Sequence, residues 1–292
     1  MCPMCWTLLI VPVALTVVHG NPVGTVMPRT GSVPVLGSGQ HQNAVSPGGD
    51  TQTTAREGEV VETADIMETG ELNPNYYPAR RAAAVVQHYL NTRYGSPYRW
   101  MFLGNVHNAS SEDVTEGRKY QLELTIQEMI SNVSGPCSAE LLFPGAGTPQ
   151  VQASCDWLLP NNTRAQEEAF YQQHRDSHNL VSGDRIPDSY GHMEPTMKPF
   201  WHLGGVASSF IMLEQSNQST LYNMAQVANF TQLETEKDQL RFQYHVLLHE
   251  MVSQEIIHWK MLITWSPAEG VKVLQTDLQP KCNCEDPPDS IN

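Results

Sequence analysis

The stretch that decides the fold is YQLELTIQEM, residues 120–129, because the chain repeats its pattern in FQYHVLLHEM, residues 242–251. In both copies apolar residues recur at every second position and lead to a Glu-Met pair. Such alternation is typical of a strand with one face on a core and the other in water. The same offset of 122 relates three further apolar pairs: Leu141 and Ile263, Phe143 and Trp265, and Val151 and Val273. One offset without gaps over roughly 30 residues predicts an internal repeat.

Each copy is expected to begin with a helix. Pro78 suits the first turn of one that ends at Gly95, and its apolar residues recur every three to four positions: Ala82, Val85, Val86, Tyr89 and Leu90. The second follows Pro195 and presents Leu203, Val206, Phe210 and Leu213. Its small residues, 204–205 and 207–209, would let a sheet or helix approach closely, although plain packing is the simpler interpretation. With about four antiparallel strands after each helix, the fold class is α+β.

The segment between the copies predicts a polar connecting helix. Residues 163–178 lack Gly and Pro, and Thr163 can serve as the N-cap. His174 and His178 are spaced to share a metal ion, with Glu167 and Glu168 a turn or two earlier. No second cluster completes a four-ligand site, so a solvated helix face is the favoured interpretation. We expect no metal and no cofactor.

The N-terminal region predicts secretion. Residues 6–18 form an apolar run of 13 residues, which is short for a membrane span and suits a signal peptide comprising residues 1–20. An uncleaved anchor at the cell surface is the alternative. Residues 21–72 are rich in Gly, Ser, Pro, Thr and Val without periodicity, and they predict a disordered segment.

Composition excludes some partners. The chain has 292 residues, with 31 acidic and 17 basic side chains, and a formal charge of −14. This gives no basic field for phosphates, so nucleic-acid binding is not expected. No membrane association is expected either, unless the N-terminal run is retained.

Secretion gives meaning to the sequons and cysteines. Five Asn-x-Ser/Thr sequons predict N-glycosylation at Asn108, Asn132, Asn161, Asn217 and Asn229. Cys137 and Cys155 lie symmetrically about Ala146, so a hairpin centred there would place them opposite each other and permit a disulfide. Two buried thiols are the alternative. Cys282 and Cys284 could pair locally, pair between chains, or stay reduced.

No catalytic motif indicates an enzyme. His249-Glu250 begins like the zinc motif H-E-x-x-H, but Ser253 occupies the position of the second His. The nucleophile elbow, the P-loop and the dinucleotide fingerprint are also absent from the sequence.

Four segments resemble the latexin family. They are Ile186-Pro-Asp-x-x-Gly191-x-x-x-Pro195, then residues 201–214, then Tyr244-x-Val-Leu-Leu-His249-Glu-x-x-Ser-Gln254-Glu-Ile-Ile257, and Trp265-x-Pro267. The resemblance spans roughly residues 75 to 276. The secretory start, the two hairpin cysteines and the long N-terminal segment are more similar to the branch of the retinoic acid receptor responder protein and ovocalyxin.

The resemblance implies two tandem cystatin-like lobes, each a helix wrapped by a curved antiparallel four-stranded sheet. The lobes would be residues 73–159 and 193–280, joined by a connecting helix and turn at 160–192 and followed by a flexible tail at 281–292. It also implies inhibition of zinc metallocarboxypeptidases of the A/B type by capping the enzyme funnel.

Within the family the contact residues correspond to His249 and Gln254. A strand-connecting loop without a partner is the alternative for this segment. His258 stands where latexin has a Pro, and glycans at Asn217 and Asn229 could obstruct docking. The Gln-x-Val-x-Gly hairpin of cysteine-protease inhibitors is missing. The leading hypothesis is therefore a secreted carboxypeptidase inhibitor, and the rival is a non-inhibitory structural glycoprotein of the extracellular matrix or egg.

Overall fold

The computed structural model describes residues 70–160, 162–176 and 179–280. The predicted signal peptide, nearly all of the predicted disordered segment, the tail with Cys282 and Cys284, Asn161 and His178 lie outside these residues. None of the helices in the described part is long and apolar enough to cross a membrane.

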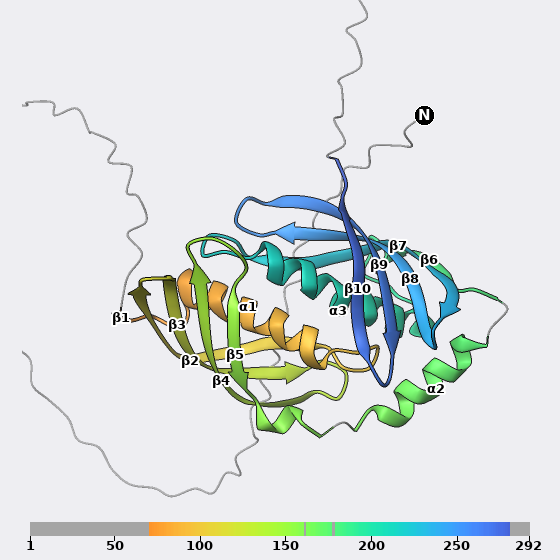
Figure 1. Ribbon diagram of the computed structural model, residues 1–292, viewed down its shortest axis with the longest axis horizontal. Coiled ribbons are helices and arrows are strands. Elements are labelled where there is room, and N and C mark those ends of the chain that lie inside the picture. Colours follow the sequence, from red (N-terminus) through yellow and green to blue (C-terminus); the bar gives the residue numbers. More distant parts are fainter. Residues whose placement is uncertain (1–69, 161, 177–178, 281–292) are drawn as a thin grey trace, which may run out of the picture. The chain divides into compact units, whose positions relative to one another are not determined.

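The first half of the described chain is a helix covered by one sheet (Figure 1). In chain order its elements are β1 (Gly70–Glu71), α1 (Tyr77–Tyr94), β2 (Met101–Val114), β3 (Gly117–Glu128), β4 (Val133–Pro144), β5 (Gln150–Ser154) and the 3-10 turn η1 (Asp156–Leu158). The strands pair antiparallel in the order β1-β2-β3-β4-β5.

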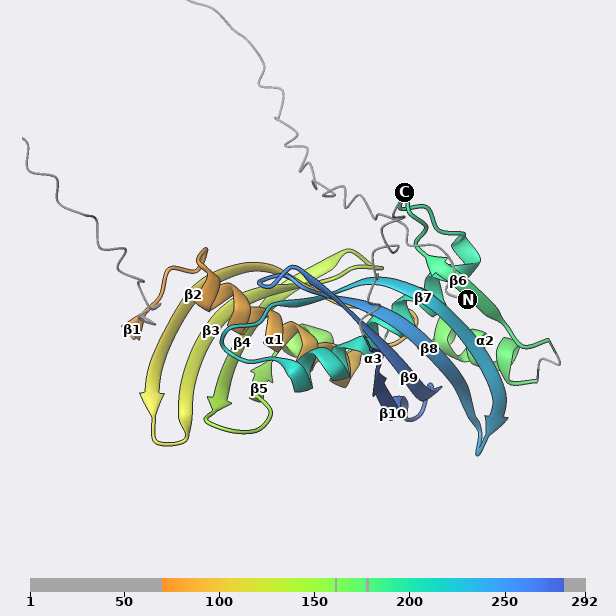
Figure 2. The ribbon, with the colours of Figure 1, turned by 90° about the horizontal axis from the view of Figure 1, so that it is seen from above.

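The second half repeats this plan. After α2 (Arg164–Arg175) come β6 (Ser182–Ile186), η2 (Pro195–Met197), α3 (Lys198–Gln215), β7 (Tyr222–Glu236), β8 (Gln239–Glu250), β9 (Glu255–Ser266) and β10 (Gly270–Leu278). Its antiparallel sheet has the order β10-β9-β8-β7-β6. Figure 2 shows the long strands of both sheets curving strongly.

The internal repeat predicted from the sequence is present in the strands. The bounds of β3 and β8 differ by 122 at both ends, and so do those of β4 and β9. Along β3 the side chains of Tyr120, Leu122, Leu124 and Ile126 are buried, while Gln121 and Glu123 between them are exposed. The equivalent residues of β8, from Phe242 to Leu248, are buried at the same positions. Each sheet therefore has an inner face on its own core and an outer, polar face.

Each sheet has five strands, not the four expected. The additional edge strands are β1, which lies within the segment predicted to be disordered, and β6, which lies in the predicted turn before the second copy. They contain two and five residues, too few to show an alternation in the sequence. Leu72, just after β1, is only 5% exposed and belongs to the first core.

Small residues allow the two halves to pack closely, as the sequence suggested. A Cβ on Gly205 of α3 would lie 2.3 Å from the Trp100 ring of the first half, and one on Gly204 would lie 2.9 Å from Val227 of the sheet behind. A Cβ on Gly95 would lie 2.7 Å from Val206 of α3. His202 Nδ1 also lies 2.9 Å from the Pro97 carbonyl oxygen. Both the sheet and the first half thus use the space that these glycines leave.

The connecting helix α2 is amphipathic, and the expectation of a solvated face is wrong for Glu167 and His174. Glu167, Phe170, Tyr171 and His174 are all under 10% exposed. The His174 ring lies 4.5 Å from that of Phe170 and 5.2 Å from that of Phe200, and burial lowers its pKa. The Glu167 carboxylate accepts hydrogen bonds from Ser96 and Thr163, at 2.6 and 2.7 Å. These two polar groups therefore anchor the helix.

Candidate functional site

The segment that carries the family resemblance forms the hairpin between β8 and β9. Its last strand pair is Glu250 with Glu255, and the turn contains residues 251–254, all exposed. We call these four residues the second tip. Gln254 ends the turn with a φ of 61°, in the left-handed region. The preceding strand pairs hold the tip on a hydrogen-bonded ladder.

Glu250 stabilises this turn, which explains why a Glu stands there without a zinc site. Its carboxylate accepts hydrogen bonds from the backbone N–H groups of Val252 at 3.1 Å and Ser253 at 2.6 Å. It also accepts one from Leu221 at 2.9 Å, in the loop before β7. Burial alone would raise the pKa of Glu250, but these hydrogen bonds outweigh it and lower the pKa. Sequence reasoning missed this role because the donors are backbone groups.

His249 and Gln254 lie on the same hairpin but are held differently. His249 is half-buried on the outer face of β8, opposite Ile256, and its Nε2 has no hydrogen-bond partner among the described residues. Gln254 is exposed and donates from Nε2 to the Met251 carbonyl oxygen at 2.5 Å. Within the described part of the chain, the His249 Nε2 is thus buried and unpaired beneath the hairpin surface, whereas the Gln254 amide supports the turn.

The second tip also exposes two apolar side chains that sequence reasoning did not single out. Met251 is 42% exposed and Val252 is 46% exposed. Covering exposed apolar side chains at a projecting turn with a partner removes them from water and stabilises the complex. The signal in the sequence was two apolar residues directly after the alternation ends at Glu250.

Cationic and titratable groups gather on the outer face behind the second tip. His245 Nε2 lies 3.3 Å from His258 Nδ1 on the neighbouring strand, and Lys260 is the cross-strand partner of His245. Burial lowers the pKa of both histidines, and the charges of His258 and Lys260 lower that of His245 further. A groove of about 740 Å³ lies beside them, lined by residues 255–258 and 278–280.

The equivalent hairpin of the first half, between β3 and β4, has the same turn design. Its turn residues, 129–132, are the first tip. Glu128 corresponds to Glu250 and accepts hydrogen bonds from the N–H groups of Ile130 at 3.0 Å and Ser131 at 3.1 Å. Asn132 corresponds to Gln254 and has a φ of 57°. The two tips therefore share their backbone form and differ in their side chains.

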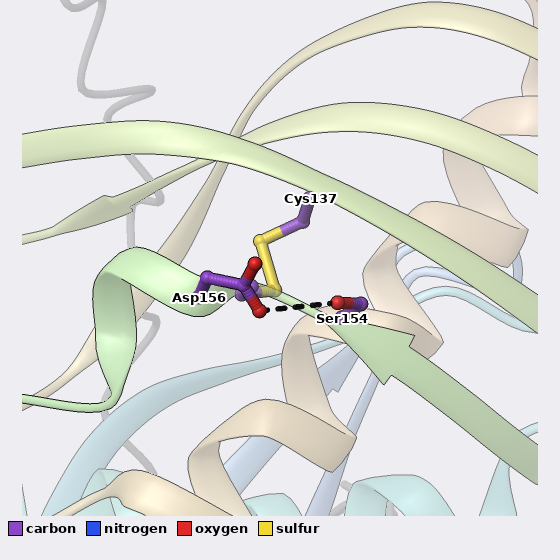
Figure 3. Close-up of a disulfide and its surroundings, with 4 residues drawn as sticks. Cys137, Ser154 and Asp156 are labelled. Atoms are coloured by element: carbon purple, nitrogen blue, oxygen red, sulfur yellow. Dashed lines mark hydrogen bonds between the residues drawn. A yellow bond between two sulfur atoms is a disulfide. The ribbon is translucent and has the colours of Figure 1, made fainter.

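The cysteines of the first half form a disulfide. The register of β4 and β5 ends at Ser138 with Ser154, so Cys137 and Cys155 are the next opposed pair, with Cα atoms 4.6 Å apart. Figure 3 shows the bond next to Ser154 and Asp156, which are joined by a hydrogen bond of 3.4 Å. Both cysteines are under 10% exposed.

Four of the five predicted glycosylation sites lie in the described part, and all four asparagines are exposed. Asn108 lies on β2, Asn132 at the first tip, Asn217 in the loop after α3 and Asn229 on β7. Within the described residues, no three His, Cys, Asp or Glu side chains come close enough to hold a metal ion.

Comparison with known proteins identifies the family. The latexin family model matches residues 72–283. Human latexin is 34% identical over 216 residues, which cover 72% of this chain and 97% of that protein. Human retinoic acid receptor responder protein 1 is 31% identical, covering 66% of this chain and 70% of its own. Chicken ovocalyxin-32 is also 31% identical, covering 69% of this chain and 74% of its own. The resemblance inferred from the sequence motifs is thus confirmed, and the chain belongs to the latexin family.

Proposed function

We propose that the protein is a secreted inhibitor of zinc metallocarboxypeptidases of the A/B type, which acts by placing the second tip in the mouth of the enzyme funnel. In this proposal the chain is not an enzyme, in keeping with its membership of the latexin family. In this proposal residues 73–159 and 193–280 are the two cystatin-like lobes, and residues 1–20 are the signal peptide.

The exposed second tip is the observation that carries the proposal. Met251 and Val252 offer exposed apolar area, and the half-buried ring of His249 lies one residue before Glu250. A concave partner would cover the apolar side chains and pack against the exposed part of the imidazole. Few residues carry most of the binding energy at such contacts, and they lie where water is excluded.

A non-inhibitory structural glycoprotein of the extracellular matrix or egg remains the second candidate. The sequons favour it, because four described asparagines are exposed and carbohydrate at each would add hydrated bulk to the surface. In that case the second tip would be a strand connection without a partner.

Titration of the mature protein into carboxypeptidase A and, in parallel, into papain distinguishes the two. We expect inhibition of the carboxypeptidase at or below micromolar concentration and none of papain. Absence of inhibition of both enzymes would favour the structural glycoprotein, and inhibition of papain alone would contradict the choice of target class.

A further inference from the structure

Two sequons occupy equivalent positions in the two halves. Asn108 of β2 is the cross-strand partner of Glu123, and Asn229 of β7 is the partner of His245. Glu123 and His245 are themselves related by the offset of 122. Both asparagines are exposed and lie on the outer faces of their sheets. Carbohydrate at these positions would therefore cover corresponding parts of both outer faces.

A third sequon lies at the first tip. Asn132 is exposed, as is Ser134, the hydroxyl residue of the sequon. The Asn132 Oδ1 accepts a hydrogen bond from Gln127 Nε2 at 2.5 Å. An N-linked glycan is attached through Nδ2, so this hydrogen bond can persist after modification. The folded hairpin thus accommodates a glycan at the end of its turn.

The second tip lacks this signal at two positions. Where the first tip continues as Asn132-Val133-Ser134, the second continues as Gln254-Glu255-Ile256. The backbone form is the same in both turns, since Asn132 and Gln254 share a left-handed conformation. The difference between the tips is therefore chemical and can be transferred by two substitutions.

We propose that an N-linked glycan on Asn132 closes the first tip, while glycans on Asn108 and Asn229 cover the outer faces, so that of these two equivalent tips the second is the one left free to dock. A glycan is bulky and strongly hydrated, and burying the first tip in a partner would require removing that water. This inference rests on the proposed secretion and inhibitory function, and it names the part of the surface that acts.

Asn217 lies in the loop that contacts the hairpin of the second tip. It lies four residues before Leu221, whose N–H is bonded to Glu250 and whose carbonyl accepts the Met251 N–H at 2.8 Å. The Ser219 N–H donates to the Asn217 Oδ1 at 2.8 Å, so the side chain is held within its own loop. The inference requires that a glycan there leaves the second tip accessible.

Occupancy of Asn132 is the first test and does not depend on inhibition. Protein secreted by cultured animal cells is reduced, alkylated and digested after glutamate, which releases residues 129–140, and the glycan is removed enzymatically in ¹⁸O water. We expect most of this peptide to carry the labelled aspartate that marks a former glycan. A mostly unmodified peptide would overturn the proposal, whatever the inhibition assay shows.

Transfer of the sequon is the second test. Gln254→Asn with Ile256→Ser reproduces the first tip's signal in the second, and each single substitution is a matched control that creates no sequon. We expect the double variant to gain the mass of one glycan and to inhibit carboxypeptidase at least tenfold less than the Gln254→Asn control, which also lacks the Gln254 side chain but carries no glycan. A glycosylated double variant that inhibits normally would overturn the proposal.

Two further outcomes distinguish a failure of the proposed glycan placement from a failure of the proposed inhibitory function. Asn217→Gln should leave inhibition unchanged, and a tenfold gain would show that the second tip is obstructed in the native protein, contrary to the proposal. If the wild type inhibits no carboxypeptidase while Asn132 is fully occupied, the proposed function fails and only the glycan placement stands.

Discussion

The two hairpin tips have the same backbone form and the same supporting glutamate, yet their surroundings differ. The first tip ends in a sequon, exposes one apolar side chain, Ile130 at 39%, and lies on a sheet whose outer face presents Glu123 and Glu140. The second ends in Gln254, exposes Met251 and Val252, and lies on a sheet whose outer face presents His245 and His258. The turn backbone and its supporting glutamate are therefore what the fold requires. The side chains that differ are where a partner can distinguish one tip from the other.

The cores of the two halves also differ. The first half closes β4 and β5 with a disulfide, whereas the equivalents of Cys137 and Cys155 at the offset of 122 are Trp259 and Asp277. Trp259 is instead paired with Leu278 across β9 and β10. One half thus uses a covalent bond where the other uses side-chain packing.

Removal of the disulfide should have the largest effect on stability. Cys137→Ser with Cys155→Ser frees a loop with a sequence separation of 18, and the free energy of unfolding should fall by about 3 kcal/mol. Urea denaturation of the oxidised wild type and the double variant measures it. The paired substitutions Trp259→Ser and Leu278→Ser in the second half test whether the packing of that cross-strand pair stabilises the fold to a similar extent. An unchanged free energy of unfolding in the cysteine variant would show that the disulfide does not stabilise the fold.

Acid should destabilise the protein through His88 of α1. Burial lowers its pKa from 6.5 to about 4, and the nearby Tyr222 backbone has a smaller opposing effect. Since the unfolded state binds the proton more readily, stability is full above pH 6.5 and is lost as pH falls from 6.5 towards 4. The shift corresponds to at most about 3 kcal/mol.

Comparison with His88→Leu isolates this effect. The bounds of α1 and α3 differ by 121, which places the non-titrating Ser209 at the equivalent position of the second helix. We expect the melting temperature of the wild type to fall more steeply between pH 6.5 and 4 than that of the variant. Parallel curves would show that His88 does not titrate with unfolding.

The sequence predicted the elements that are long enough for their hydrophobic periodicity to be recognised. The repeated strands of 12 residues and the two 18-residue helices were found because alternation and helical spacing persist along them. β1 and β6 were missed because they are short edge strands. Glu167 and His174 were assigned to a solvated face because polar residues on a buried helix face look the same in the sequence as exposed ones.

The site was predicted only in part. The motif containing His249 and Gln254 indicated the hairpin, and the contact role of these residues stays a prediction. The exposure of Met251 and Val252 required the structure, since apolar residues next to a strand are usually buried. The function of Glu250 was hidden because its partners are backbone N–H groups of the turn and of a loop 29 residues away.

Substitution of His249→Ala with Gln254→Ala should weaken carboxypeptidase inhibition by about 2 kcal/mol, while the melting temperature changes little. In the proposed contact both side chains face the enzyme, and both lie outside the core. Gln127→Ala with Asn132→Ala in the first half is the matched control, and it should leave inhibition nearly unchanged. Equal inhibition by the wild type and the second-tip variant would exclude these residues as the contact.

The smallest effect tests the feature that the tips share. Glu128→Gln and Glu250→Gln keep the side-chain shape but replace a carboxylate oxygen that accepts backbone N–H groups by an amide that donates. We expect each to lower the free energy of unfolding by about 1 kcal/mol at pH 7, measured with urea. Glu250→Gln should cost slightly more, because Glu250 also accepts the Leu221 N–H.

The dependence on pH identifies the cause of that cost. The folded protein holds the pKa of Glu250 below its ordinary value of 4.5, so the carboxylate stabilises the fold above pH 4.5 and this contribution is lost as pH falls below it. The difference between wild type and Glu250→Gln should therefore shrink in acid. If it stays constant, the loss comes from altered packing of the side chain. Glu128→Gln could leave the free energy of unfolding unchanged while Glu250→Gln lowers it. The two turns would then share a backbone geometry but not the interaction that maintains it. The second tip would depend on the hydrogen bond from Leu221, which has no counterpart among the described residues of the first half.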